Sequence, residues 1–511
     1  MLMVHHFLEH SARRVPCKVA VVSESQRLTY AELDAAANRL ANALLKQGVV
    51  RGDRVVLWLP NNIEAAVGIF AVLKAGGVFV MANTSTKPDK LTRMIHDCRA
   101  AAIVAPTRYG DAAAAVMADA ESVRLIILTG DADAKSAEQQ AGVLRYDDIQ
   151  QNASANPPAS AAIDQDLACL IYTSGSSGEP KGVMSSHANV VFAAWSICTY
   201  LENASEDVII SALPLSFDYG LYQLIMSVRV GATLVLERSF AYPVQFLQRL
   251  VAERATGFPG VPTMFALLLQ MDLSGYDLSS LRYLTNTGAA LPPSHILRLQ
   301  QAVPHARLYS MYGLTETKRT LYLPPEQLAR RPDSVGIPIP GTEAWLVDER
   351  DQRLGPNQIG ELVVRGRHVM RGYWEKPEAT AQRYRPGSLP GETLCYTGDL
   401  FRMDEEGYFY FVGRQDDIIK SRGEKVAPKE VENRLYALDG VAEAAVIGVP
   451  DPILGQAVKA FVVTQNGALS AADVQRHCRA HLEDFMVPKY VEFVDELPKT
   501  TSGKIRKTTL T

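Results

Sequence analysis

Residues 170–183 read LIYTSGSSGEPKGV, in which an apolar, strand-like run leads into a loop rich in glycine and hydroxyl residues. Glycines let backbone N–H groups approach and wrap an anion. The hydroxyl groups add hydrogen-bond donors, and the lysine supplies a point charge. The stretch therefore predicts a phosphate-binding loop after a buried strand. The residues expected to contact phosphate are Thr173, Ser174, Gly175, Ser176, Ser177, Gly178 and Lys181.

This loop differs from a Walker A loop, which needs the pattern G-x-x-x-x-G-K-[ST]. The only Gly-Lys pair of the chain is Gly503-Lys504, and Pro498 stands where the first glycine would be. Pro180, directly before Lys181, disfavours the helix that such a loop starts. A Ser/Gly-rich surface turn is the plain alternative. It does not account for the strand before the loop or for the Pro-Lys-Gly ending.

Upstream of the loop, helical and extended patterns alternate. Residues 31–48 place apolar side chains on one helical face and end at Gly48. The pattern then predicts a buried strand at 54–60, a helix at 62–74 and a strand at 78–81. Strand, helix and strand in this order are typical of α/β units with a parallel sheet. The polar, proline-rich residues 151–160 predict a surface loop.

The pattern changes near residue 340. Residues 364–374 (VRGRHVMRGYW) and 396–414 each indicate a β-hairpin, the second with Glu406-Gly407 as its turn. After Arg414 the chain indicates a compact α+β unit. Its expected elements are a helix at 428–438, strands at 444–448 and 458–463, and a helix at 470–482.

A chain of 511 residues exceeds the about 250–300 residues that a single core supports, so several domains are expected. We expect an α/β fold with a large N-terminal domain of α/β subdomains plus a β-rich subdomain, followed by a small, mobile α+β domain at the C-terminus. The expected division is residues 1–414, a hinge at 415–416 and residues 417–511.

Composition excludes several classes of protein. The net charge of −4 argues against broad nucleic-acid binding, which needs a concentrated basic face. The sequence contains no window of about 18 apolar residues, so no membrane span is expected. The N-terminus lacks the apolar run of a signal peptide. The six cysteines are scattered without paired spacing, so neither a disulfide framework nor a zinc site is expected. A cytoplasmic protein is the resulting prediction.

Further motifs follow the phosphate loop: TNTGAA at 285–290, YGLTET at 312–317, YTGD at 396–399, GRQDD at 413–417 and PKTTSGKI at 498–505. Their order resembles that of the adenylate-forming superfamily, which contains acyl-CoA synthetases, adenylation domains of non-ribosomal peptide synthetases and firefly luciferase. The resemblance covers nearly the whole chain. Ala289 is a departure, because the family often has glutamate there.

The resemblance implies a site for ATP and Mg²⁺. Thr315 would bind the α-phosphate, and Glu316 would hold Mg²⁺ against the phosphates, which suits a hard cation that prefers carboxylate and phosphate oxygens. Gly288 would lie against adenine, and Tyr312 would line the nucleotide site. Asp399 would accept hydrogen bonds from the ribose hydroxyls. Arg414 would reach ribose or phosphate.

The last motif implies a catalytic lysine. Lys504 would enter the site for adenylation, where a cation between carboxylate and α-phosphate reduces anionic repulsion. Lys181, Thr315 and Glu316 complete the implied catalytic set. Asp416 stands at the family's hinge, and Lys425 lies in the segment that lines the thiol tunnel in relatives.

The acid substrate is less well defined. The residues expected to line its pocket are Phe217, Asp218, Tyr219, Tyr222, Met264, Thr285, Thr287, Met311, Arg319 and Thr320. A carboxylate at Asp218 needs a cation in a desolvated pocket. That cation is either a substrate amine, as in amino-acid-activating relatives, or Arg319. The polar lining favours a small polar acid or an amino acid over a medium- or long-chain fatty acid.

The implied reaction forms an acyl-adenylate and passes the acyl group to a thiol, either coenzyme A or the phosphopantetheine of a separate carrier protein. Two other classes are possible on this fold: a luciferase-like oxygenase and a non-catalytic nucleotide-binding scaffold. Degenerate scaffolds are expected to lose one of Lys181, Glu316, Asp399 and Lys504, and all four are present.

Overall fold

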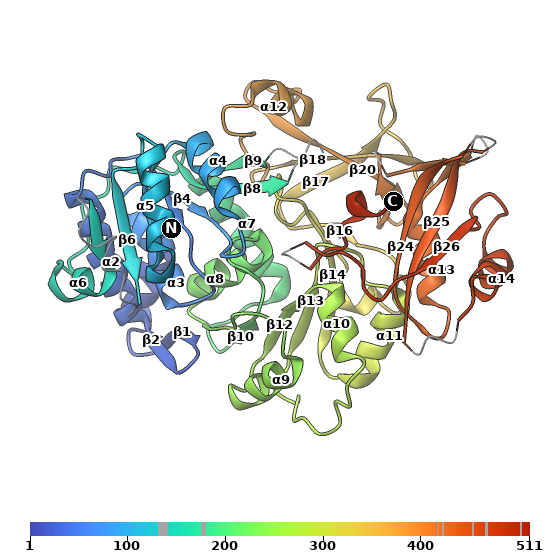
Figure 1. Ribbon diagram of the computed structural model, residues 1–511, viewed down its shortest axis with the longest axis horizontal. Coiled ribbons are helices and arrows are strands. Elements are labelled where there is room, and N and C mark those ends of the chain that lie inside the picture. The colour runs from blue at the N-terminus through green and yellow to red at the C-terminus, as the bar shows by residue number, and fades with distance from the viewer. Residues whose placement is uncertain are drawn as a thin grey trace.

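The computed structural model describes residues 1–130, 142–174, 180–415, 417–421, 424–451, 454–465, 469–500 and 503–511. Its described part is a mixed α/β structure with a large N-terminal region and a small C-terminal region. Figure 1 shows the N-terminal region in blue to orange and the C-terminal strands and helices in red at the opposite side. The expected fold class is confirmed.

A seven-stranded sheet holds the strand that leads into the phosphate loop. Its order is β7 (Val143–Arg145), β6 (Leu125–Thr129), β5 (Ala100–Pro106), β3 (Arg54–Leu57), β4 (Val78–Met81), β8 (Leu167–Ser174) and β9 (Pro180–Ser186). The strands from β7 to β8 are parallel, and β9 returns antiparallel to β8. The predicted strand at 78–81 is confirmed, and the strand predicted at 54–60 is present but already ends at Leu57. Pro180 begins a strand, as expected for a loop without a following helix.

A nine-stranded sheet forms the second layer. Its order is β16 (Ile337–Pro338), β15 (Leu321–Tyr322), β14 (Arg307–Tyr312), β13 (Tyr283–Asn286), β12 (Gly257–Gly260), β10 (Val208–Ser211), β11 (Thr233–Leu236), β1 (Val19–Ser23) and β2 (Gln26–Thr29). The strands from β14 to β1 are parallel. Their carboxyl ends therefore meet at one edge of the sheet, where ligands of α/β proteins bind.

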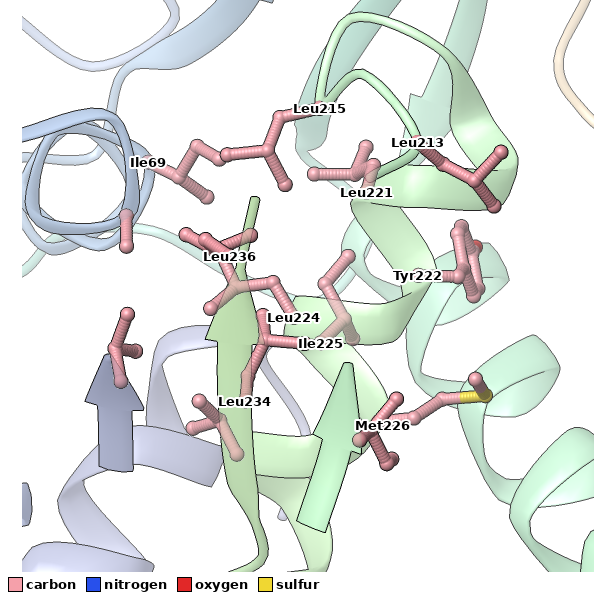
Figure 2. Close-up of a cluster of buried hydrophobic side chains, with 14 of the residues drawn as sticks. Ile69, Leu213, Leu215, Leu221, Tyr222, Leu224, Ile225, Met226, Leu234 and Leu236 are labelled. Atoms are coloured by element: carbon pink, nitrogen blue, oxygen red, sulfur yellow. The ribbon is translucent and has the colours of Figure 1, made fainter. Parts of the chain in front are cut away.

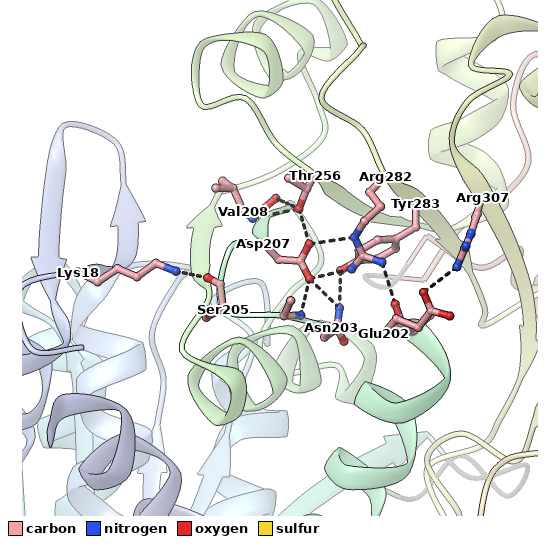
Figure 3. Close-up of polar contacts among 12 residues, drawn as sticks. Lys18, Glu202, Asn203, Ser205, Asp207, Val208, Thr256, Arg282, Tyr283 and Arg307 are labelled. Carbon is pink, nitrogen blue, oxygen red and sulfur yellow. Dashed lines mark hydrogen bonds and ion pairs between the residues drawn. The ribbon is translucent and has the colours of Figure 1, made fainter. Parts of the chain in front are cut away.

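The opposite edge, at the amino ends of these strands, is fixed by Asp207 (Figure 3). Its carboxylate accepts hydrogen bonds from Arg282 Nη2 and from Thr256 Oγ1, both at 2.8 Å. Asp207 immediately precedes β10, Thr256 precedes β12 and Arg282 precedes β13. A single buried acid thus joins the starts of three neighbouring strands.

Helices fill the space between the two sheets. Helix α8 (Asp218–Val230) is buried along its length and packs with β11, in an apolar cluster that also contains residues of α3 (Ile63–Lys74). Figure 2 shows Leu221, Leu224 and Ile225 of α8 among Leu234, Leu236 and Ile69. This apolar cluster holds the first turn of α8 in place. The helix predicted at 31–48 is α2 (Tyr30–Lys46), which begins with a capping box of Thr29 and Glu32.

The remaining helices complete the layers. They are α1 (His5–Arg14), α4 (Pro88–Cys98), α5 (Gly110–Asp119), α6 (Tyr146–Asn152), α7 (His187–Leu201), α9 (Pro243–Ala252), α10 (Pro262–Leu268), α11 (Pro293–Ala302), α12 (Pro377–Arg383), α13 (Pro428–Tyr436) and α14 (Ala471–His481), with 3₁₀ turns at Thr107–Tyr109, Pro325–Gln327 and Lys507–Thr509. None of the helices that the structure describes is long and apolar enough to cross a membrane. All six cysteines are free thiols.

The β-rich part is an antiparallel sheet in the order β17 (Thr342–Val347), β18 (Ile359–Gly366), β20 (Thr393–Met403) and β19 (Tyr384–Pro386), with β21 (Phe409–Arg414) also paired to β20. The hairpin predicted at 396–414 is confirmed as β20–β21. The hairpin predicted at 364–374 is wrong. Strand β18 already has β17 and β20 as neighbours, so a returning strand has no free edge. Residues after Gly366 instead cross to β9, where Trp374 N–H donates to Gly182 O at 2.8 Å.

The C-terminal region is a five-stranded sheet covered by α13 and α14. Its strands are β23 (Glu424–Val426), β22 (Ile419–Ser421), β25 (Gly455–Thr464), β24 (Val441–Asp451) and β26 (Tyr490–Phe493). The two predicted helices are confirmed, and the two predicted strands extend further than expected because they form one long hairpin. After β26 the chain runs back toward the centre of the molecule (Figure 1).

Candidate active site

The site is built at the carboxyl ends of β13 and β14. Thr285 and Asn286 end β13, and the chain turns at Gly288 with a φ of +90°. This backbone conformation favours glycine. A Cβ atom at Gly288 would also lie 3.2 Å from Lys504 Cε, so the position permits a close approach between the two segments.

The phosphate loop joins two paired strands. Thr173 on β8 lies opposite Lys181 on β9, so the lysine returns to the start of the loop. The Nζ atom of Lys181 lies 5.4 Å from the centre of the Tyr373 ring. Several predicted contacts lie outside the described residues: Gly175, Ser176, Ser177 and Gly178, the side chain of Ser174, and also the predicted hinge Asp416 and the side chain of Lys425.

Glu316 is a buried carboxylate in the loop after β14. Its Oε1 accepts a hydrogen bond of 2.6 Å from the hydroxyl of Tyr373. Burial lowers the pKa of the nearby Arg383 guanidinium, but the Glu316 carboxylate and the Tyr373 side chain together more than offset this effect, so the pKa is raised. Thr315, the preceding residue, is half-buried.

The acid groups fit a magnesium ion that is shared with a nucleotide. Within the described ranges, no three or more His, Cys, Asp or Glu side chains form a cluster that could hold a metal by themselves. The Tyr373 hydrogen bond uses only Oε1 of Glu316, so the second carboxylate oxygen can bind a metal ion. One carboxylate supplemented by phosphate oxygens is the usual way in which proteins bind Mg²⁺.

Asp399 forms a second acidic position, on β20. Its Oδ2 accepts a hydrogen bond of 2.6 Å from the hydroxyl of Tyr312, and Arg414 Nε lies 3.5 Å from its Oδ1. Asp399 and Arg414 lie opposite each other on the paired strands β20 and β21, which brings their side chains together. Burial raises the pKa of Asp399, and Arg414 and Tyr312 oppose this rise. Tyr312 ends β14, so the two predicted nucleotide motifs meet at this carboxylate.

Lys504 comes from the C-terminal region and reaches the same site. Its Nζ lies 5.4 Å from the centre of the Phe217 ring. Thr263 Oγ1 donates to Gly503 O at 3.3 Å and holds the lysine's segment against α10. Burial lowers the pKa of Lys504, and the Asp218 carboxylate partly offsets this shift.

The predicted acid pocket lies around the start of α8. Asp218 is the first residue of that helix and is buried. The hydroxyl of Tyr219 contacts both Thr285 O at 2.8 Å and Thr285 Oγ1 at 2.6 Å. The guanidinium of Arg319 lies 4.3 Å from the centre of the Tyr219 ring. The other predicted lining residues, Tyr222, Met264, Thr287, Met311 and Thr320, are buried.

Asp218 and Arg319 do not form an ion pair, although both are buried. The Nε atom of Arg319 has no hydrogen-bond partner among the residues that the structure describes. The internal pairing that the sequence left open is therefore not formed in this structure. Each charge stays available to another group.

Sequence reasoning missed three residues at the site. Lys318 is fully buried, its Nζ has no hydrogen-bond partner in the described ranges, and it lies 5.8 Å from the centre of the Tyr222 ring. Its position between Glu316 and Arg319 in a motif expected to be buried could have identified it. Tyr373 and Arg383 carry no local signal, because only the tertiary fold brings them to Glu316.

Comparison with known proteins agrees with the motifs. Residues 8–374 match the family described as AMP-binding enzyme, and residues 430–504 match the AMP-binding enzyme C-terminal domain. A long-chain-fatty-acid–CoA ligase from Bacillus subtilis (strain 168) is 32% identical over 98% of this chain and 92% of its own. A feruloyl-CoA synthase from Amycolatopsis sp. is 35% identical over 97% and 96% of the two chains.

A solved structure gives the same result at the level of the fold. The crystal structure of ATP-bound MatB from Rhodopseudomonas palustris is 31% identical, with a TM-score of 0.89 over 99% of this chain and 98% of that one. Two family matches and relatives of nearly the same length leave one conclusion. The chain belongs to the AMP-binding enzyme family, within the adenylate-forming superfamily that its motifs resemble.

Proposed function

We propose that this chain is an AMP-forming ligase that activates a small polar carboxylic acid, or an amino acid, and transfers the acyl group to coenzyme A. The substrate carboxylate attacks the α-phosphorus of ATP, which gives an acyl-adenylate and pyrophosphate. A thiol then attacks the carbonyl, a thioester forms and AMP leaves. The observation that carries this proposal is the position of Lys504, which approaches Gly288 and the ring of Phe217 from the C-terminal region.

The proposed roles follow from this geometry. Lys504 neutralises charge between the attacking carboxylate and the α-phosphate. Lys181 and the loop after Thr173 bind the other phosphates, and Thr315 binds the α-phosphate. Asp399 accepts hydrogen bonds from the ribose, supported by Tyr312 and Arg414.

Glu316 is the proposed Mg²⁺ ligand. When bound, Mg²⁺ neutralises phosphate charge and fixes the geometry of the phosphates. The residues of the chain provide the remaining positioning, which supplies most of the catalysis in phosphoryl and nucleotidyl chemistry.

The substrate class follows from charge. Asp218, Lys318 and Arg319 are buried near the start of α8, and no ion pair joins Asp218 to either cation. Burying unpaired charges is costly, so a substrate that pairs with them gains affinity. A purely apolar chain would give Lys318 and Arg319 no anionic partner and would leave Asp218 with only the longer-range attraction of Lys504. We therefore favour an acid that carries an amine, a second anionic group or both.

The names of the relatives favour coenzyme A as acceptor, since a coenzyme A ligase and a feruloyl-CoA synthase align over nearly the whole chain. A carrier protein presents the same thiol on phosphopantetheine and remains the alternative. Lys425 lies in the segment proposed to line the thiol path after the C-terminal region turns about residue 416.

A hydroxylamine-trapping screen with ATP and Mg²⁺ tests this function. The panel contains amino acids, dicarboxylic acids, aryl acids and medium- and long-chain fatty acids. We expect acid-dependent AMP release to be strongest with a polar acid, followed by thioester formation with coenzyme A. Preference for an unsubstituted long-chain acid would overturn the substrate class, and no AMP formation with any acid would overturn the ligase activity.

A further inference from the structure

A short segment connects the loop that carries Glu316 with the strand that carries Lys181. Residues 370–374 follow β18 and cross between the Glu316 loop and β9. On one side, Met370 N–H donates to Glu316 O at 3.0 Å. On the other, Met184 N–H donates to Gly372 O at 2.9 Å, and Trp374 N–H donates to Gly182 O at 2.8 Å. The segment is thus hydrogen-bonded to the metal-ligand loop and to the strand that carries Lys181.

Tyr373, in the middle of this segment, contacts both functional side chains. Its hydroxyl donates to Glu316 Oε1 at 2.6 Å, and its ring centre lies 5.4 Å from Lys181 Nζ. The side chain is buried, and Tyr373 N–H donates to Thr380 Oγ1 at 3.0 Å, which fixes its backbone. One aromatic ring therefore joins a carboxylate at its hydroxyl and an ammonium at its face.

The two contacts have different physical effects. The hydrogen bond occupies one oxygen of Glu316 and orients the carboxylate, so its other oxygen would be held in one orientation for a metal ion. The ring face attracts the ammonium of Lys181 through its quadrupole and limits the positions of a flexible side chain. A carboxylate and a lysine that must engage the same polyphosphate are thereby held in a fixed relationship before ATP binds.

We propose that Tyr373 is a positioning residue that couples the metal-ligand carboxylate of Glu316 to the phosphate-binding ammonium of Lys181. The inference rests on the proposed function, because it assigns both partners to Mg·ATP. Tyr373 contacts neither reacting group, so its effect is on the orientation of the two side chains. The alternative is that Tyr373 only fills the core of the β-rich part, where the centre of its ring lies 5.7 Å from that of Tyr384.

The chain offers a matched control for this reading. Tyr384 is buried in the same cluster, and its hydroxyl has no hydrogen-bond partner in the part of the chain that the structure describes. Tyr384→Phe removes one buried hydroxyl from the same core without touching Glu316 or Lys181. Tyr373→Phe removes only the hydroxyl that bonds Glu316, and Tyr373→Met removes the ring as well.

The variants are compared by two binding measurements on the full chain. Electron paramagnetic resonance measures manganese binding in the presence of ATP, and this affinity depends on the orientation of the Glu316 carboxylate. Equilibrium dialysis with ATP in the presence of EDTA measures metal-free ATP affinity, which depends on the position of Lys181. We expect Tyr373→Phe to weaken manganese binding roughly tenfold, as loss of a hydrogen bond to a metal ligand does, and to leave metal-free ATP binding unchanged. Tyr373→Met should weaken both.

The outcomes separate the readings. Manganese binding by Tyr373→Phe equal to that of the wild type overturns the inference. A loss of the same size in Tyr384→Phe also overturns it, because core packing then explains the effect. ATP binding in EDTA by Tyr373→Met equal to that of the wild type would overturn the contact with Lys181, and Tyr373→Leu takes the place of Tyr373→Met if that variant does not fold, because only a variant without the ring tests this contact. A wild-type protein that binds no ATP would instead overturn the proposed function, so the two failures are distinguishable.

Discussion

The ammonium of Lys504 lies 5.4 Å from the centre of the Phe217 ring, which joins the last residues of the chain to the start of α8. Phe217 precedes Asp218, so the same contact brings the lysine beside the predicted acid pocket. Among the neighbouring charged groups, the Asp218 carboxylate does most to stabilise the protonated ammonium. This arrangement suits the first half-reaction, in which an anion attacks an anion.

Replacing Lys504 is expected to impair adenylation selectively. Lys504→Ala should lower acid-dependent pyrophosphate exchange by roughly 10²–10³-fold, the cost of losing one preorganised charge-stabilising group. Its ATP affinity should stay within a few-fold of the wild type, because the proposed nucleotide contacts lie elsewhere. Thioester formation from preformed acyl-adenylate should persist. Undiminished exchange in this variant would refute the role.

The acid pocket is expected to select substrates by a second charged group, either an amine or an anion. Asp218→Ala should reduce pyrophosphate exchange more with amino acids than with simple acids, because only an amine pairs with that carboxylate. Arg319→Gln should do the reverse and penalise acids with a second anionic group. Losing a hydrogen-bonded charge partner typically costs about 2–5 kcal/mol, or roughly 30-fold and more. Equal losses across all acids would exclude both assignments.

Short-range sequence patterns were sufficient to predict part of this site. The strand before the phosphate loop and Pro180 after it predict a loop that returns to its start, and Thr173 indeed lies opposite Lys181. The turn at Glu406-Gly407 predicts the β20–β21 hairpin, whose far end pairs Asp399 with Arg414. In both cases the contacts lie between strands that are adjacent in the chain.

Contacts between distant segments could not be predicted in this way. Residues 364–374 look like a hairpin locally, but the partners of β18 come from elsewhere in the chain, so Tyr373 is delivered to Glu316 instead. Whether Asp218 pairs with Arg319 depends on how far two side chains extend from different elements. Sequence spacing carries no information about that distance.

The pH dependence of adenylation follows from the environment of Lys504. Burial lowers the pKa of this lysine, so its protonated form is lost at a pH below the ordinary value of about 10.4. Pyrophosphate exchange should therefore decline on the alkaline side below that value. Asp218 raises the pKa of Lys504, so Asp218→Asn should move the decline to still lower pH. Lys504→Arg is the control, because a guanidinium stays charged throughout this range. An unchanged alkaline limb in Asp218→Asn would contradict the coupling.

Stability is expected to depend on the opposite edge of the nine-stranded sheet, away from the chemistry. Asp207 bonds Arg282, Thr256 and Ala204 N–H, and removing its carboxylate leaves these donors without their acceptor (Figure 3). Asp207→Ala should lower the free energy of unfolding by about 3 kcal/mol, the lower end for a broken buried pair because water reaches Arg282.

An exposed ion pair in the same region provides the comparison. Arg307 Nη1 lies 2.7 Å from Glu202 Oε2, and both side chains are more than half exposed. Arg307→Gln should cost at most about 1 kcal/mol, since screened surface pairs contribute little. Urea unfolding followed by circular dichroism measures both variants, and their pyrophosphate exchange under native conditions should match the wild type. Equal losses of stability in the two variants would show that Asp207 does not act as a buried anchor for the three strands, because an exposed pair would then contribute as much.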